Sequence, residues 1–191
     1  VVSTDFRGEV IRAFQAEGWI FYGETTIWKD PQAQSIRTKS FALAFQTKNR
    51  DSAGTRPALA DYLLIFKKHG DNEVAISPDV SNDEWIQWAR PIWTGIRESD
   101  TLQYQSAREN ADDRHICPLQ LEVIRRGIDL WTNPNDIILS PFMGIGSEGY
   151  VALEMGRRFV GVELKESYFR QATANLEQAT KLTQDLFGEA A

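Results

Sequence analysis

The stretch IILSPFMGIGSEG, residues 137–149, decides the fold of this chain. It opens with apolar residues typical of a buried strand and continues into a loop with the glycine spacing G-x-G-x-x-G. Glycines at such a turn allow a tight bend and a close approach of the backbone to a ligand. The free amides at the start of the following helix can bind polar or anionic groups. We therefore expect a strand, a ligand-binding turn and a helix, with the glycines at Gly144, Gly146 and Gly149.

A second apolar stretch, FVGVE at residues 159–163, ends in an acid. A carboxylate at the tip of the second strand can accept hydrogen bonds from ribose hydroxyls. A dinucleotide-binding fold would need several more strand–helix units, whereas the sequence after Glu163 has room for one helix. No Lys-Ser or Lys-Thr follows the glycines, which excludes the phosphate loop of an NTPase. The pattern predicts a site for a single nucleoside cofactor rather than for NAD.

The rest of the chain alternates between helical and strand-like segments, which predicts an α/β fold. Residues 62–66 are a third continuous apolar run, and such runs are typical of strands buried on both faces of a mostly parallel sheet. Helical spacing occurs at residues 5–18, 117–130, 149–156 and 167–186, and further strand-like segments occur at 19–22 and 25–28.

Composition narrows the class of protein. The chain has 191 residues, of which 42% are hydrophobic, and this is enough for one domain with a buried core and an insertion. No apolar run approaches the roughly 18 residues that span a membrane, and no signal peptide is recognisable. Cys117 is the single cysteine, so an intrachain disulfide is excluded, and the two histidines lack the spacing of a metal site. These features predict a cytoplasmic protein without a bound metal.

The charge is unevenly distributed. The net charge is -6, yet the first third of the chain is mildly basic. An acidic total therefore does not exclude a nucleic-acid partner, although a solvated loop is an equally good interpretation of this stretch. The basic residues concerned are Arg37, Lys39, Lys48, Arg50 and Arg56.

Four segments together resemble the amino-type DNA methyltransferases, which act on N6 of adenine or N4 of cytosine. FMGIGSEG (142–149) and VELKESY (162–168) are similar to their S-adenosylmethionine-binding region. HICPLQ (115–120) is similar to the motif that these enzymes place just before the glycine motif. RPALADYLLIFKK (56–68) is similar to their motif near the target base. The order is that of the permuted β group, and the details are most similar to phage and prophage methylases. The resemblance implies a Rossmann-like, circularly permuted methyltransferase fold.

The resemblance also implies roles for parts of the chain. Residues 1–68 would be outer strands and the base-side motif of the catalytic domain, 69–114 a target-recognition insertion, and 115–191 the half that binds S-adenosylmethionine. The partner would be double-stranded DNA, with the basic residues named above on its phosphates. Glu163 would hold the ribose of the cofactor. The implied cofactor-binding residues are His115, Ile116, Pro118, Leu119, Ser140, Phe142, Gly144, Gly146, Ser147, Glu163 and Leu164.

The sequence departs from the family pattern in two places. Ser140 stands where the family commonly has Asp, and no Pro-Pro occurs anywhere in the chain. The family's catalytic motif, Asp/Ser/Asn-Pro-Pro followed by an aromatic residue, is therefore missing, and we expect no catalytic residue in this chain. The resemblance also leaves the central strands of the sheet unaccounted for. We expect a fragment that is inactive alone and completed by an upstream segment or a second protomer.

Two alternatives stay open at the level of sequence. The chain could be a remnant of a prophage methylase that binds cofactor or DNA without catalysis. It could also be a methyltransferase that acts on RNA or on a small molecule. The expected location, in each case, is the cytoplasm of a bacterial or phage-infected cell.

Overall fold

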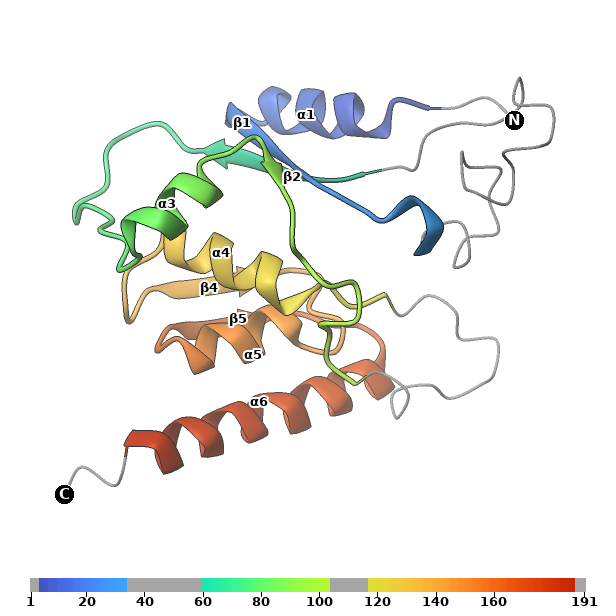
Figure 1. Ribbon diagram of the computed structural model, residues 1–191. Helices are drawn as coiled ribbons and strands as arrows, with labels where there is room; N and C mark the ends of the chain where they lie inside the picture. Colours follow the sequence, from blue (N-terminus) through green and yellow to red (C-terminus); the bar gives the residue numbers. More distant parts are fainter. Residues whose placement is uncertain (1–3, 34–59, 104–116, 188–191) are drawn as a thin grey trace. The chain divides into compact units, whose positions relative to one another are not determined.

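The computed structural model describes residues 4–33, 60–103 and 117–187 (Figure 1). These residues form two compact units, which are considered separately. The first consists of the described residues up to 73 together with 82–95. The second consists of 74–81 and the described residues from 96 onward. Residues 69–114, the predicted recognition insertion, therefore contribute to both units, and their role in target recognition stays a prediction.

The first unit has a three-stranded sheet in the order β2-β1-β3, with β1 and β2 antiparallel and β1 and β3 parallel. The first helix begins where the Asp5 carboxylate accepts a hydrogen bond of 3.0 Å from the Gly8 amide. The core includes Trp93, which is 1% exposed and donates its ring N–H to the Trp88 carbonyl. The elements are α1 (Phe6–Ala16), β1 (Ile20–Ile27), β2 (Asp61–Lys67), α3 (Asn82–Trp88) and β3 (Ile92–Trp93).

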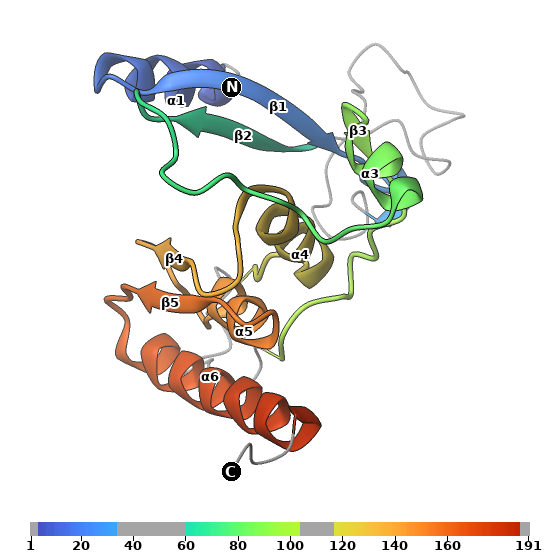
Figure 2. The ribbon, with the colours of Figure 1, turned by 90° about the vertical axis from the view of Figure 1, so that its left-hand side faces the viewer.

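The second unit pairs two parallel strands and packs helices on them. The register runs from Ile137 opposite Arg158 to Ser140 opposite Gly161. Figure 2 shows the two strands side by side, with α5 and α6 running along them. The apolar core joins α4 to α5 and includes Ile138 and Phe159 from one face of the sheet. The elements are α4 (Leu121–Trp131), β4 (Ile137–Ser140), α5 (Ser147–Glu154), β5 (Arg158–Gly161) and α6 (Glu166–Phe187).

The predicted alternation of helices and strands is confirmed, but the predicted burial of the strands is wrong. Ile137 is 56% exposed, Leu139 64% and Val160 51%. The reason is that, among the described residues, helices cover one face of the β4–β5 sheet and leave these side chains on the other. Residues 62–66 are likewise exposed or half-buried rather than enclosed on both faces.

The prediction of a mostly parallel sheet is wrong for the longest pair of strands. β1 and β2 run antiparallel over their whole length, with a bulge between Phe21 and Gly23. The two strand-like segments predicted at 19–22 and 25–28 therefore form one strand, Ile20–Ile27, that contains a bulge. The permuted order and the absence of central strands stay predictions. In the described part of the chain, none of the helices is both long enough and apolar enough to cross a membrane.

Candidate functional site

The parallel pairing of β4 and β5 brings the two predicted halves of the site together. Ser140 ends β4 directly beside Gly161, the last residue of β5. The pairing continues beyond the strands, because the Val162 amide donates to the Ser140 carbonyl and the Met143 amide donates to the Val162 carbonyl, each at 2.9 Å. Both loops therefore leave the sheet at the same edge, which is where open α/β sheets bind ligands.

Two glycines shape the turn between β4 and α5. Gly144, with φ of 57°, and Gly146, with φ of 84°, both have left-handed backbone, which residues with a Cβ adopt only at a cost. Gly146 is the N-cap of α5, and a Cβ there would lie 3.2 Å from the Cβ of Ala172 in α6. A Cβ at Gly144 would meet nothing within 4 Å, so this position requires glycine for its backbone angle alone.

Gly149 serves packing instead. A Cβ at this position would lie 2.6 Å from side-chain atoms of Phe159 and of Leu176, so α5 can lie against β5 and α6 only because no side chain intervenes. The same contact region is fixed by a buried hydrogen bond of 2.8 Å from the Asn175 side-chain amide to the Ile145 carbonyl. The third glycine of the motif therefore holds the turn against its supporting helix.

Glu163 links the two loops. Its Oε2 accepts a hydrogen bond from the Gly144 amide at 2.9 Å, and its Oε1 accepts one from the Lys165 amide at 2.8 Å. Each carboxylate oxygen has a second lone pair. The side chain can therefore keep the glycine loop in place and still accept a ligand hydroxyl. Its predicted contact with ribose stays a prediction.

A cavity of about 210 Å³ opens beside the glycine loop. The segment before α4 forms part of its wall, although it is distant from the glycines in sequence. The wall combines apolar side chains with several polar groups, which can orient a bound small molecule. The predicted cofactor-binding residues that line it are Pro118, Leu119, Phe142, Gly144 and Ser147.

The other predicted binding residues lie around this cavity rather than in its wall. Ser140, at the end of β4, and Gly146, within the turn, are both buried, with Ser140 only 7% exposed. Leu164 is 98% exposed, so it could act only as an outer cover for a ligand. His115 and Ile116 lie outside the described residues.

The cavity wall also contains residues that the sequence did not single out. Glu148, in the first turn of α5, lines it, and burial raises the pKa of this carboxyl group above its usual value. Tyr168 lines it from α6, with the Lys165 ammonium 4.3 Å from its ring centroid. Both lie within the segments that carry the family resemblance. Their position in those segments was the only signal that could have found them.

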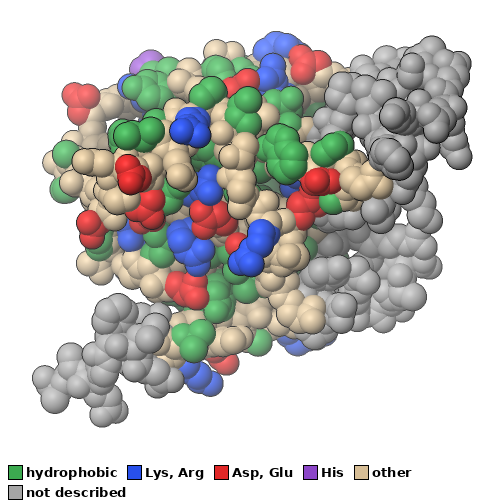
Figure 3. All heavy atoms as spheres, in the orientation of Figure 1, with side chains coloured by type: hydrophobic (Ala, Val, Ile, Leu, Met, Phe, Trp, Pro, Cys, Tyr) green, Lys and Arg blue, Asp and Glu red, His purple; other side chains and the backbone are tan. Residues whose placement is uncertain are grey.

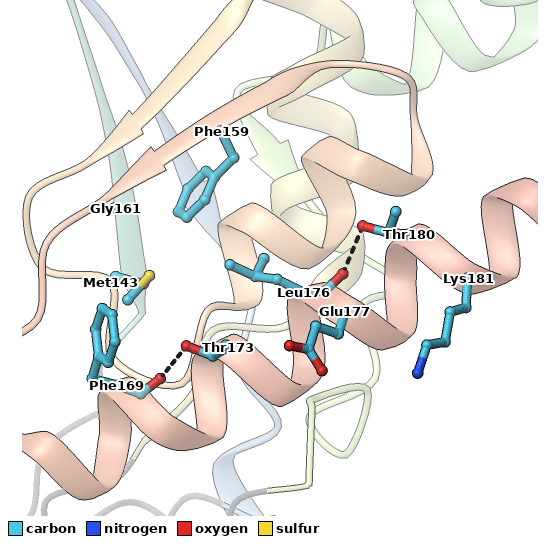
Figure 4. A pocket seen from close by; sticks show the side chains of 9 residues that line it. All are labelled: Met143, Phe159, Gly161, Phe169, Thr173, Leu176, Glu177, Thr180 and Lys181. Carbon is cyan, nitrogen blue, oxygen red and sulfur yellow. Dashed lines mark hydrogen bonds between the residues drawn. The ribbon is translucent and has the colours of Figure 1, made fainter.

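A second, larger cavity of about 480 Å³ lies between β5 and α6 (Figure 4). Phe159 and Leu176 point into it, while Lys181 points away from Phe159 (Figure 4). The hydroxyls of Thr173 and Thr180 donate to carbonyls of their own helix, which leaves them poorly placed to select a ligand. The smaller cavity, beside the glycine amides, is therefore the better candidate for a nucleoside site.

The predicted DNA-binding residues lie outside the described part of the chain. This applies to Arg37, Lys39, Lys48, Arg50 and Arg56. Among the described residues on the face shown in Figure 3, basic and acidic side chains are intermixed rather than gathered by sign. The DNA contacts expected at these five residues stay a prediction.

Comparisons with known proteins agree on one family. Residues 5–174 match the N6/N4 family model described as DNA methylase. The type II methyltransferase M.BglI of Bacillus subtilis is 28% identical over 172 residues, which cover 89% of this chain and 43% of that protein.

Solved structures show the same fold. TTHA0409 of Thermus thermophilus, solved in complex with S-adenosyl-L-methionine, aligns with a TM-score of 0.63 and 16% identity. The alignment covers 94% of this chain and 62% of that one. The cytosine-N4-specific PvuII DNA methyltransferase aligns with a TM-score of 0.58 and 17% identity, over 96% of this chain and 63% of that one.

The chain thus spans less than two thirds of the length of each of these three proteins, and less than half of M.BglI. The α/β class of a methyltransferase fold is confirmed by the solved structures. The phage or prophage origin stays a prediction. With the family model matched over most of its length, the chain belongs to the N6/N4 DNA methylases.

Proposed function

We propose that this chain is the cofactor-binding part of a site-specific DNA methyltransferase that uses S-adenosylmethionine. The observation that carries the proposal is the edge of the β4–β5 sheet. There Glu163 and the glycine loop are joined by a hydrogen bond of 2.9 Å, next to a cavity of about 210 Å³. A ribose-binding acid and a glycine turn at adjacent strand ends are what an adenosine cofactor requires. TTHA0409, solved with this cofactor, shares the fold.

Each end of the cofactor has residues suited to it. Glu163 would accept the ribose hydroxyls, with Leu164 and the 89%-exposed Phe142 against the adenosine. Pro118, Leu119 and Ser147 would border the methionyl end. The bound cofactor supplies an activated methyl group on sulfur, which the exocyclic amino group of adenine or cytosine attacks in line. This chain's share of the catalysis is to hold the methyl donor in one orientation.

Double-stranded DNA is the proposed substrate. Its amino groups are inaccessible inside the base stack, so the target base would be extruded before reaction. The predicted phosphate contacts at Arg37, Lys39, Lys48, Arg50 and Arg56 would supply affinity without sequence information. The similarity to the type II methyltransferase M.BglI supports a role in restriction–modification. A cytoplasmic location, where DNA is accessible, is part of the same proposal.

A further polypeptide segment would complete the enzyme, either from a longer chain or from a second protomer. Two observations support this. The sequence contains no Pro-Pro motif to grip the target amino group. The β4–β5 sheet also presents apolar side chains to solvent on one face, Ile137, Leu139, Val160 and Val162, each at least half exposed. Such a face is typical of a surface that another element covers. We expect this chain alone to show no methyl transfer to unmethylated DNA.

Calorimetric titration with S-adenosylmethionine tests the cofactor site directly. The wild-type chain should bind, and Glu163→Ala should weaken binding about 10-fold or more, since a charge-assisted hydrogen bond is lost. Glu166→Gln is the matched control, because Glu166 follows closely in sequence but is an exposed partner of Arg170. If the wild-type chain bound neither S-adenosylmethionine nor the product of its demethylation, the chain would be a structural remnant of a methylase. Unchanged affinity of Glu163→Ala would refute the ribose assignment.

A further inference from the structure

Glu148 is a carboxylate in the wall of the smaller cavity. It stands in the first turn of α5, immediately after the glycine turn. Its neighbours in the wall include the apolar side chains of Pro118, Phe142 and Ile145. Among the described residues that line this cavity, Glu148 is the one with a carboxylate. Its position places a negative charge where a ligand of this cavity would lie.

The surroundings of Glu148 leave that charge poorly compensated. Burial raises the pKa of the carboxyl group, and a hydrogen bond with its own backbone amide offsets the effect only in part. None of the other described residues that line the cavity carries a basic side chain. In the part of the chain that the structure describes, no ion pair of Glu148 with a basic side chain is formed.

A role in stabilising the helix does not account for this placement. Acidic residues in a first turn interact favourably with the helix dipole and do so at the surface. Glu166, in the first turn of α6, is such a residue, since its side chain is 84% exposed and pairs with Arg170 at 2.6 Å. Glu148 also stands in the first turn of its helix, α5, but it lines a cavity.

We infer that the Glu148 carboxylate receives the α-ammonium group of the S-adenosylmethionine methionyl end; this inference rests on the proposed function. The cofactor carries two positive groups, the sulfonium and the ammonium. Of these two groups, only the ammonium can donate N–H hydrogen bonds to a carboxylate. The neighbouring amides of the first turn of α5 suit the cofactor's carboxylate. The wall thus offers adjacent partners for both charges of an α-amino acid.

The test compares three ligands of the wild-type chain and Glu148→Gln by calorimetry. S-adenosylmethionine has both cationic groups, S-adenosylhomocysteine keeps the ammonium but has a neutral sulfur, and 5′-methylthioadenosine has neither. We expect Glu148→Gln to weaken the first two ligands alike, about 10- to 100-fold, and to leave the third unchanged. Glu166→Gln should change none of the three.

Each other outcome overturns the inference. A loss confined to S-adenosylmethionine would assign Glu148 to the sulfonium, and an equal loss for all three ligands would indicate a damaged cavity. If Glu148→Gln bound all three ligands as tightly as the wild type, Glu148 would make no contact with the cofactor. The proposed function fails separately, if the wild-type chain binds none of the three. Circular dichroism of Glu148→Gln verifies that the variant is folded before these titrations are interpreted.

Discussion

The two faces of the β4–β5 sheet are built from the same kinds of residue and behave differently. On one face Ile138 and Phe159 pack against the core of α4 and α5. On the other face, Ile137 and Leu139 are more than half exposed, because they alternate with Ile138 along the strand and so point away from the helices. Apolar sequence therefore specifies strand formation here, whereas burial depends on which elements are present to cover each face.

The packed face is most sensitive at Gly149. Gly149→Ala should lower the free energy of unfolding by about 3 kcal/mol, because its Cβ would overlap side chains of Phe159 and Leu176. Urea unfolding followed by circular dichroism measures the change. Gly144→Ala is the control, since it strains the backbone angle without a clash, and it should cost about 1 kcal/mol. Equal effects of the two variants would contradict the packing role of Gly149.

Alanine substitutions at the neighbours Ile137 and Ile138 compare how much each face of the β4–β5 sheet contributes to stability. Ile138→Ala should cost about 2 kcal/mol, because it removes side-chain contacts with the core. Ile137→Ala should change the free energy of unfolding by about 0.5 kcal/mol or less, because the side chain is 56% exposed. Urea unfolding of both variants under one condition gives the difference. If Ile137→Ala cost as much as Ile138→Ala, the outer face would be covered in solution, for example by a second copy of the chain.

A small effect on stability is expected at Glu148, which stands in the first turn of α5 and lines the smaller cavity. Its raised pKa means that the folded state keeps a proton at pH values where the unfolded chain has lost it. This contribution to stability is therefore complete below about pH 4.5 and is lost as the pH rises through the folded pKa. Glu148→Gln should raise Tm by about 2 °C at pH 7 and leave it unchanged near pH 4.

Thermal unfolding at both pH values checks this prediction, with Glu166→Gln as the exposed control. A variant that is less stable than the wild type at pH 7 would mean that Glu148 has a stabilising partner in the unliganded protein.

Local sequence predicted the glycine turn and its flanking elements better than it predicted the rest of the fold. The glycine turn, its strand and its helix follow from backbone requirements within a few residues. All three form as expected, except that the helix begins and ends two residues earlier than predicted. The bulge at Phe21 and the antiparallel pairing with β2 could not be read in advance, since they depend on partners distant in sequence. Glu148 was missed because a first-turn acid is ordinarily a surface residue.

Two of the three tryptophans at 85–93 illustrate the same limit. Trp88 and Trp93 are core residues of the first unit, while Trp85 is 48% exposed. Sequence spacing could not distinguish these fates, because the decisive contact is the short pairing of Ile92 and Trp93 with β1.

The hydrogen bond between Glu163 and the Gly144 amide has a thermodynamic consequence. The loop is already clamped before any nucleoside arrives, so little conformational entropy remains to be lost on binding. The same carboxylate that would recognise the ligand also maintains the shape into which the ligand fits. Recognition and preorganisation are thus linked through one side chain, and replacing it would make the empty site both less selective and less ordered.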